Sequence, residues 1–495
     1  MRGVDLFPMP KILFASLLAL VALLPLPVAA VFPWSWALMA SWVGLMLIFW
    51  GGQIAIGKHM AAVHPHRLWW ILTPFFLAIL WAVLQTASFM PDAWHHPFWT
   101  TSATALGDVV TGSISINPQQ TLEGVIRLLA YGGIFWLALQ LGRDEKRAHF
   151  AFYAIAIVAG LYAAYGIAVE FTNTHMILWY EKKTYLSSLT STFVVRNHFA
   201  SYAGLGLLCT TALLWQKARS AVSGVRHPAE RRQLLIEYLA GRSWPLLATW
   251  FLLAMALLLT NSRGGFLATI LGLMTFFLAI GLGHSAPRRW VAGFAMATLA
   301  AGYLFFLLSG EVVSDRLEQT TLAQEGDRLR VYDVTIAAIQ DSPLLGTGLG
   351  TFKEVFRFHQ TENVLNIFHQ AHNTYLENAL ELGIPAASLL TLSVLGGVLL
   401  CGFGIVRRRR NAAYSAIGLA ASMLVGVHSL FDFPLQIPAI AATYAFILGV
   451  ACAQSWGHLT TTSTLVHHVG LNTGAIQIVR INIVLQAVAV IVLKP

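Results

Sequence analysis

The sequence predicts an all-α protein: a polytopic bundle of transmembrane helices with about twelve spans and one large, partly helical loop on the outer side of the membrane. Only 11% of the 495 residues are charged and 57% are hydrophobic, and the mean hydropathy is +0.67. Soluble proteins carry about 25% charged residues, so most of this surface is expected to face lipid. Apolar runs of about 20 residues, the length needed to cross a bilayer, recur along the whole chain.

Twelve of these runs are expected to be membrane spans. Their approximate ranges are 12–31, 35–57, 68–88, 120–141, 149–170, 197–215, 245–260, 265–283, 290–309, 380–405, 412–430 and 437–455. The first also resembles a signal peptide, because Arg2 precedes an apolar core that ends near the small residues Ala29 and Ala30. A signal peptide enters with its N-terminus inside, so cleavage would leave the topology of the later spans unchanged.

The basic residues indicate the orientation of these spans. With the N-terminus inside, most of the 31 Lys and Arg fall in cytoplasmic segments, as the positive-inside rule requires. The net charge of +9 therefore reflects topology and contact with anionic membrane lipids rather than nucleic-acid binding, and the run Arg407–Arg410 has the same explanation. All three cysteines, Cys209, Cys401 and Cys452, fall in expected spans, where they form neither a disulfide framework nor a zinc site.

We expect one membrane domain, residues 1–455, followed by a tail, residues 456–495, to which the sequence gives no role. Outer loops are expected at 89–119, 171–196 and 310–379. In the largest, Asp327 to Gln340 reads as an amphipathic helix that Asp341-Ser342-Pro343 ends, and Gly346, Gly348 and Gly350 form an irregular turn. A second helix is expected from His369 to Leu382, leading into the tenth span. Loops of this length usually have a function.

Two arginines stand at outward helix ends, where the positive-inside rule makes Arg unexpected. Arg263 lies in the short break Thr260-Asn261-Ser262-Arg263-Gly264-Gly265, and Arg196 opens the sixth span, followed by Asn197 and His198. A guanidinium group pairs two donors with phosphate oxygens, and the helix after Arg263 offers unpaired N–H groups to an anion. Both are candidate ligands of a diphosphate head group. The alternative for each is an interfacial Arg that extends to lipid phosphates.

One histidine stands out in the large loop. His372 is placed where a base could take a proton from an acceptor hydroxyl, and Glu377 follows five residues later. The alternative is an ordinary hydrogen-bonded loop histidine. His359, His369 and His372 also suggest a metal site, but no carboxylate-bearing motif accompanies them, so we expect no metal. The glycine run at 346–350 has the wrong spacing for a nucleotide-binding loop.

Four stretches together resemble the O-antigen ligase and O-antigen polymerase superfamily, over roughly residues 190–455. The histidine signature is His372-Asn373, nine residues, then Gly383-Ile384-Pro385; Ala386 stands where the family usually has a second Gly. The other three are Arg196-Asn197-His198-Phe199-Ala200, Asn261-Ser262-Arg263-Gly264-Gly265 and Asp341-Ser342-Pro343-Leu344-Leu345-Gly346-Thr347-Gly348.

The resemblance implies a metal-independent, inverting glycosyltransferase that needs no cofactor, in the bacterial inner membrane with its site facing the periplasm. It implies that Arg196 and Arg263 bind the diphosphate of an undecaprenyl-linked glycan and that His372 acts on the acceptor hydroxyl. Asn197, Asn373 and Glu377 are the expected supporting residues. The expected partners are the lipid-linked glycan, its acceptor and membrane lipids, with no nucleic acid.

Within the superfamily the acceptor distinguishes three functions. A ligase transfers the glycan to lipid A-core, which we favour; a polymerase transfers it to another lipid-linked repeat; a protein O-oligosaccharyltransferase transfers it to a protein hydroxyl. The segment from His428 to Leu435 resembles polysaccharide-polymerase members. A multi-span secondary transporter is the alternative of another class. Transporters use ionisable residues within the membrane, and the only candidates here are Glu123 and Arg127, one helical turn apart and able to pair with each other. Convergence of Arg196, Arg263 and His372 would favour the transferase.

Overall fold

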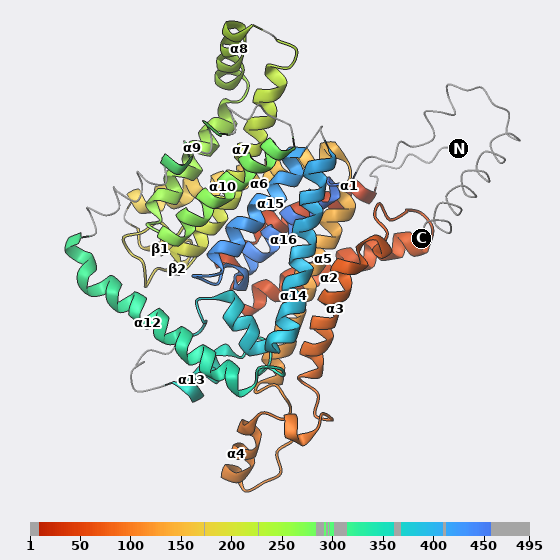
Figure 1. Cartoon of the computed structure of the whole chain (residues 1–495), viewed down its shortest axis with the longest axis vertical. Helices are drawn as coiled ribbons and strands as arrows, with labels where there is room; N and C mark the ends of the chain where they lie inside the picture. Colours follow the sequence, from red (N-terminus) through yellow and green to blue (C-terminus); the bar gives the residue numbers. More distant parts are fainter. Residues whose placement is uncertain are drawn as a thin grey trace, which may run out of the picture. The chain divides into compact units, whose positions relative to one another are not determined.

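Helices make up almost all of the secondary structure in a computed structural model of the chain (Figure 1). The structure describes residues 9–456 except 173, 226, 284–291, 294–295, 297, 301–313, 361–367 and 409–411. The helices that correspond to expected spans are α1 (Met9–Leu23), α2 (Pro33–Ala55), α3 (Trp69–Leu84), α5 (Pro118–Leu141), α6 (Glu145–Phe171), α7 (Arg196–Ala221), α9 (Trp244–Leu259), α10 (Arg263–Leu282), α14 (Thr374–Arg407), α15 (Ala412–His428) and α16 (Pro438–Ala453).

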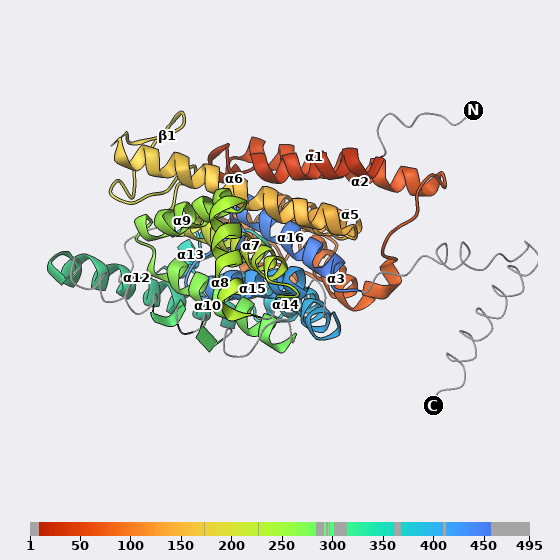
Figure 2. The same ribbon diagram turned by 90° about the horizontal axis from the view of Figure 1, so that it is seen from above.

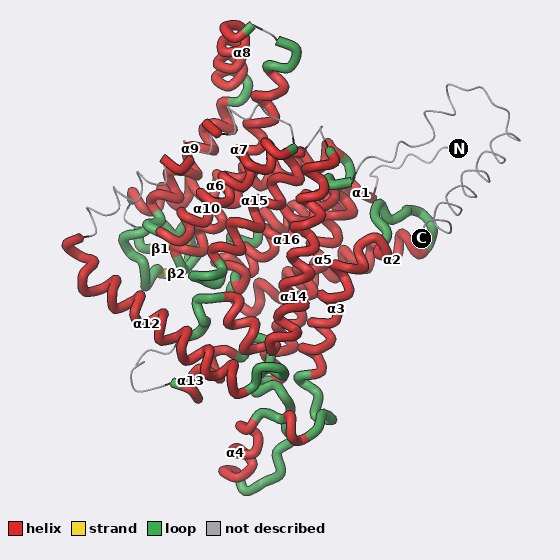
Figure 3. The backbone as a smooth tube through the Cα atoms, viewed as in Figure 1, coloured by secondary structure: helices red, strands yellow, loops and turns green. Residues whose placement is uncertain are grey.

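The remaining elements lie in the connections between these helices (Figure 3). They are α4 (Pro97–Leu106), α8 (Pro228–Gly241), α12 (Ser314–Asp341), α13 (Phe352–His359), the short 3-10 helices η1 (Val28–Ala30), η2 (Pro65–Leu68), η3 (Asp92–Trp94) and η4 (Pro434–Gln436), and the strands β1 (Met176–Ile177) and β2 (Tyr180–Glu181). The two strands pair antiparallel and are the only sheet among the described residues.

The predicted helical membrane protein is confirmed, although the count of twelve spans stays a prediction. Six expected spans correspond to helices long and apolar enough to cross a membrane: α2, α3 with η2, α5, α6, α10 and α14. Four correspond to shorter apolar helices, α1, α9, α15 and α16. The span expected at 197–215 lies in α7, which is long but outside both groups, and the span expected at 290–309 falls mostly outside the described residues, as does the tail from residue 457.

Helix α7 lies at the centre of the helix packing. It contacts α6 and α9 on one side and α10 and α15 on the other (Figure 2), and almost every side chain from His198 to Leu213 is buried. Small residues permit this close approach: a Cβ atom on Gly206 would overlap Ala159 of α6, and one on Gly204 would overlap Thr269 of α10. Because α7 is surrounded by protein, it does not need the continuous apolar surface of a lipid-facing helix.

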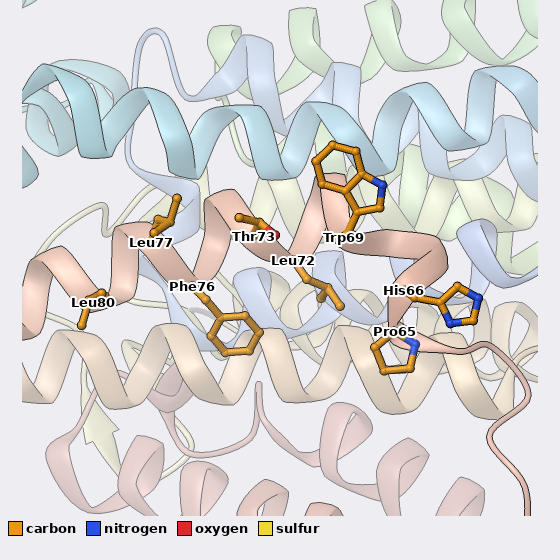
Figure 4. Close-up of a pocket in the computed structure, with 8 residues that line it drawn as sticks. All are labelled: Pro65, His66, Trp69, Leu72, Thr73, Phe76, Leu77 and Leu80. Atoms are coloured by element: carbon orange, nitrogen blue, oxygen red, sulfur yellow. The ribbon is translucent and has the colours of Figure 1, made fainter. Parts of the chain in front are cut away.

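The outermost helices present large apolar side chains outward. Leu45 and Ile48 of α2 are 67% and 73% exposed, and Leu399 and Phe403 of α14 are similarly exposed. An open groove of about 520 Å³ runs along α3 (Figure 4). Its lining is almost entirely apolar: Pro65, His66, Trp69, Leu72, Thr73, Phe76, Leu77 and Leu80. Such surfaces suit contact with lipid rather than water.

The expected amphipathic helix of the large loop is present as the C-terminal part of α12, which ends at Asp341 as predicted. Its apolar face, including Val331 and Val334, packs against Phe352 and Phe356 of α13 and Leu380 of α14. The expected irregular turn is also present, since Gly346, Gly348 and Gly350 all have positive φ. In Figure 1, α12 lies across the ends of the long helices instead of among them.

The predicted helix start at His369 is wrong. Residues 369–373 are irregular, and α14 begins at Thr374. Asn373 caps this helix, because its side-chain oxygen accepts hydrogen bonds from the backbone N–H groups of Tyr375 and Leu376, at 3.0 and 3.1 Å. His372, immediately before the cap, has φ +52°, which a helix would not allow. The histidine signature therefore straddles a helix start.

Candidate active site

Arg196 is the first residue of α7, and its guanidinium group is partly buried beside the 171–196 loop. Its Nη1 donates a hydrogen bond to Oγ of Ser188 at 3.3 Å, and its Cζ lies 5.3 Å from the centre of the Tyr185 ring. Its Nε is buried and has no hydrogen-bond partner in the protein. A buried guanidinium N–H without a partner is costly, so this group is suited to an anionic ligand.

Arg263 is the first residue of α10 and is exposed. The break before it is held by Ser262, whose Oγ accepts a hydrogen bond from the Gly265 N–H at 3.2 Å and so caps the helix. The same Oγ donates to Oδ1 of Asn197 at 2.8 Å. This bond joins the starts of α7 and α10, of which Arg196 and Arg263 are the first residues.

His372 lies in the irregular segment before α14 with its imidazole partly exposed. Its Nδ1 faces Oδ1 of Asp432 at 3.6 Å, and its ring centre lies 5.0 Å from that of Phe433. Its carbonyl oxygen accepts a hydrogen bond from the hydroxyl of Tyr332 on α12, at 3.0 Å. Asp432 therefore holds one side of the imidazole ring, and Tyr332 of α12 holds the backbone of His372.

Asp432, in the turn between α15 and α16, is the centre of the site and is only 1% exposed. Its Oδ1 also lies 3.8 Å from Nε2 of His198, and its Oδ2 lies 4.0 Å from Nε2 of His428. Burial alone would raise the pKa of Asp432, but the interactions with His198 and His372 outweigh burial and hold that pKa well below its usual value. The carboxylate is therefore ionised at neutral pH.

Asp432 faces His372 directly, and it faces histidines that lie beside Arg196 and Arg263. His198 follows Arg196 by two residues on α7, and His428 packs against the backbone beside Arg263, because a Cβ atom on Gly264 would lie 3.5 Å from its ring. Both histidines face the carboxylate that faces His372. The structure thus brings the helix starts that bear Arg196 and Arg263 to the pair of His372 and Asp432, although these segments are far apart in the sequence.

The expected supporting residues hold the backbone rather than the reacting groups. Asn197 joins α7 to α10, and Asn373 caps α14 and also donates a hydrogen bond from Nδ2 to the Leu430 carbonyl, at 3.2 Å. The buried carboxylate of Glu377 accepts hydrogen bonds from the Ala371 N–H at 2.9 Å and from Nε2 of Gln436 at 2.7 Å. Glu377 therefore fixes the chain just before His372 and does not contact its ring.

Two residues of this cluster were missed by sequence reasoning. Asp432 lies in the segment from His428 to Leu435, whose resemblance to polymerases was the available signal. Arg328 lies within the amphipathic helix that the sequence predicts, one turn before Tyr332. Because the Tyr332 hydroxyl binds the His372 carbonyl and residues four apart share a helix face, Arg328 lies on the face of α12 that meets the site.

His359, Glu123 and Arg127, which the sequence raised as metal-site or transporter residues, make other contacts in the structure. His359 of the proposed metal trio is 2.8 Å from Asp341, and across the described ranges no three His, Cys, Asp or Glu side chains group as metal ligands. In the same ranges no ion pair joins Glu123 to Arg127: Glu123 accepts a hydrogen bond from Gln119 at 3.4 Å, and Arg127 lies 5.7 Å over the Trp36 ring. These two residues therefore do not pair with each other among the described residues.

This arrangement has the elements of acid–base and electrostatic catalysis. With its Nδ1–H directed at Asp432, His372 keeps the Nε2 lone pair for an incoming hydroxyl proton, and the carboxylate stabilises the imidazolium that forms. The neighbouring guanidinium groups stabilise negative charge. Fold and site together define a multi-pass membrane protein with a cationic, histidine-containing centre at the ends of its helices.

Comparison with known proteins supports the family resemblance. Residues 248–391 match the family model described as O-antigen ligase, a range that contains Arg263 and His372 but neither Arg196 nor Asp432. Over 353 residues the chain is 23% identical to a General O-oligosaccharyltransferase of Acinetobacter baylyi (strain ATCC 33305 / BD413 / ADP1). That alignment covers 65% of this chain and 55% of the relative, so the chain spans about half the length of the curated relative. The resemblance to the O-antigen ligase superfamily is confirmed, and a glycan-transferring function is supported.

Proposed function

We propose that residues 1–455 form a glycosyltransferase domain that moves a glycan from undecaprenyl diphosphate to an acceptor hydroxyl at the periplasmic face of the bacterial inner membrane. The observation that carries the proposal is the convergence around Asp432, which links His372 to the helix starts that bear Arg196 and Arg263. No role is proposed for the tail, residues 456–495.

In the proposed reaction the acceptor oxygen attacks the anomeric carbon of the glycan from the face opposite the diphosphate. Nε2 of His372 takes the hydroxyl proton, the bond between the anomeric carbon and the phosphate oxygen breaks, and undecaprenyl diphosphate leaves with the bonding electrons. Arg196 and Arg263 stabilise the charge that develops on the diphosphate, and they need little reorganisation because Asn197 and Ser262 join their helices. The configuration at the anomeric carbon is inverted. Because the diphosphate bond is already activated, the scheme requires neither a metal nor a cofactor.

Lipid A-core is the acceptor we favour, in keeping with the O-antigen ligase description of the matched family. The name of the Acinetobacter relative, a General O-oligosaccharyltransferase, supports protein hydroxyls as a second candidate acceptor. A polymerase, which uses another lipid-linked repeat, shares the same donor chemistry. The three differ in what the product is attached to.

The proposal is tested by deleting the gene and complementing the strain with Arg263→Ala or His372→Ala. Both variants are expected to insert in the membrane at the wild-type level and to transfer no glycan. Bare lipid A-core with accumulated long lipid-linked chains identifies a ligase, single repeats on the core identify a polymerase, and unglycosylated proteins with normal lipopolysaccharide identify the oligosaccharyltransferase. Normal glycan on every acceptor in both variants refutes the proposed transfer.

A further inference from the structure

The side chain of Tyr332 connects helix α12 to the candidate site. The Tyr332 hydroxyl donates to the carbonyl of His372 at 3.0 Å and lies 3.4 Å from the carbonyl of Leu430, two residues before Asp432. It thereby spans the two segments that carry the base and its acid. Arg328 lies one turn earlier on α12, and residues four apart share a helix face. The face of α12 that fixes His372 therefore also carries a guanidinium group.

The charges of the site are not balanced by the residues that the structure describes. Arg196, Arg263 and Arg328 contribute three positive charges, whereas Asp432 contributes one negative charge that three histidines already surround. Among the residues that the structure describes, no ion pair joins any of these three arginines to a carboxylate. Like charges held together repel, so the cluster is stabilised by an anion that carries at least two charges. A diphosphate has that charge and the matching oxygens.

From this geometry we propose that α12 completes the donor site: Arg328 is a third ligand of the carrier diphosphate, and Tyr332 is a positioning residue that aligns His372 with the bound donor. The inference rests on the proposed function and extends it, because it names residues outside the trio predicted from the sequence. Because α12 would both bind the donor through Arg328 and hold His372 through Tyr332, the alignment of His372 would depend on whether a diphosphate is bound.

Binding of farnesyl diphosphate to the full-length protein in detergent tests the role of Arg328. Loss of one charge-assisted contact is expected to weaken binding in Arg328→Ala by about 10- to 100-fold. Arg330→Ala, exposed on the same helix, is the matched control and is expected to bind as the wild type does. Equal affinities of Arg328→Ala and wild type overturn the proposal. The proposal is also overturned if dioleoylphosphatidylglycerol displaces farnesyl diphosphate from wild type but not from Arg328→Ala. That result would show that Arg328 binds a phospholipid head group.

The parallel variants Arg196→Ala and Arg263→Ala separate this inference from the proposed function. If they weaken binding of farnesyl diphosphate and Arg328→Ala does not, only the inference fails. If none of the three variants weakens binding, the proposed diphosphate site itself fails. Reduced binding in all three supports both.

Tyr332→Phe tests the positioning role, since it removes the hydroxyl and keeps the ring. We expect kcat for glycan transfer to fall by about tenfold, the effect of losing one hydrogen bond, while KM for the donor and the melting temperature stay at wild-type values. A rise in KM without loss of kcat, or a lower melting temperature that accounts for the lost activity, overturns this role.

Discussion

Nδ1 of His372 lies 3.6 Å from Oδ1 of Asp432, across 60 residues of sequence. The distance is slightly longer than a hydrogen bond, and both His372 Nδ1 and Asp432 Oδ2 are buried without a hydrogen-bond partner in the protein. Such pairs often shorten when substrate binds and the histidine gains a proton. The pair therefore resembles the acid–histidine arrangement that orients a general base, and it accounts for the burial of an aspartate at a membrane surface.

Asp432→Asn tests this pairing. The amide keeps the size of the side chain but loses the charge that orients and stabilises the imidazolium of His372. We expect kcat for glycan transfer to fall by about 10²- to 10⁴-fold with little change in KM, because the corresponding change in serine proteases has an effect at the upper end of that range. The measurement is initial transfer rate in proteoliposomes with an extracted lipid-linked glycan.

The matched control for this variant is Asp333→Asn, an exposed aspartate on α12. It is expected to retain the wild-type rate. If Asp432→Asn also transfers glycan at the wild-type rate, the carboxylate does not assist His372.

The depressed pKa of Asp432 predicts a pH dependence of stability. Because the pKa of the folded state lies well below the unfolded value of about 3.9, ionised Asp432 stabilises the fold fully above that value, and the stabilisation is lost as the pH falls through the folded-state pKa. Thermal unfolding in detergent from pH 7 to about pH 3 is expected to show a steeper loss of melting temperature for wild type than for Asp432→Asn. Parallel curves for the two proteins would show that the carboxylate contributes no such stabilisation.

The sequence predicted the parts of this structure that depend on local pattern. The apolar runs predicted most helices, Asp341-Ser342-Pro343 predicted the end of α12, and the three glycines predicted the turn that follows. The predicted start of α14 is too early because residues 369–373 contain no glycine or proline that would mark a break, whereas the side chain of Asn373 caps the helix there. The pattern of residue types does not show which side chain accepts hydrogen bonds from the first N–H groups of a helix.

The site was predictable only where a family motif marked it. Arg196, Arg263 and His372 stood in recognisable stretches, and the structure brings the segments that bear them together. Arg328 had no local signal, and the only signal for Asp432 was the resemblance of its segment to polymerases. The significance of both residues comes mainly from neighbours far away in the sequence, such as His372 and His198. Tertiary packing, and not spacing along the chain, creates the cluster.

The bond between Asn197 and Ser262 predicts coupled effects on stability. Ser262→Ala removes both the cap of α10 and the link to α7, so we expect it to lower the free energy of unfolding by about 1 kcal/mol through the cap alone. Asn197→Ala removes only the link. A double-mutant cycle in detergent is expected to give a coupling energy of about 0.6 kcal/mol, the average for interhelical hydrogen bonds in membranes. Strict additivity of the two changes would mean that this bond does not hold the arginine-bearing helix starts together.

The glycine of the histidine signature, Gly383, is explained by close packing of two backbones. It has φ +75° inside α14, and a Cβ atom there would overlap the carbonyl of Leu344 in the glycine turn. Gly383→Ala is therefore expected to lower the free energy of unfolding by at least about 1–3 kcal/mol from backbone strain, measured by chemical denaturation in detergent, and to reduce transfer. Gly402→Ala is the matched control, because this glycine of the same helix has no atom within 4 Å of an added Cβ. Equal stability of the two variants would show that the turn can move away from α14, and the register that brings His372 to Asp432 would then not depend on this contact.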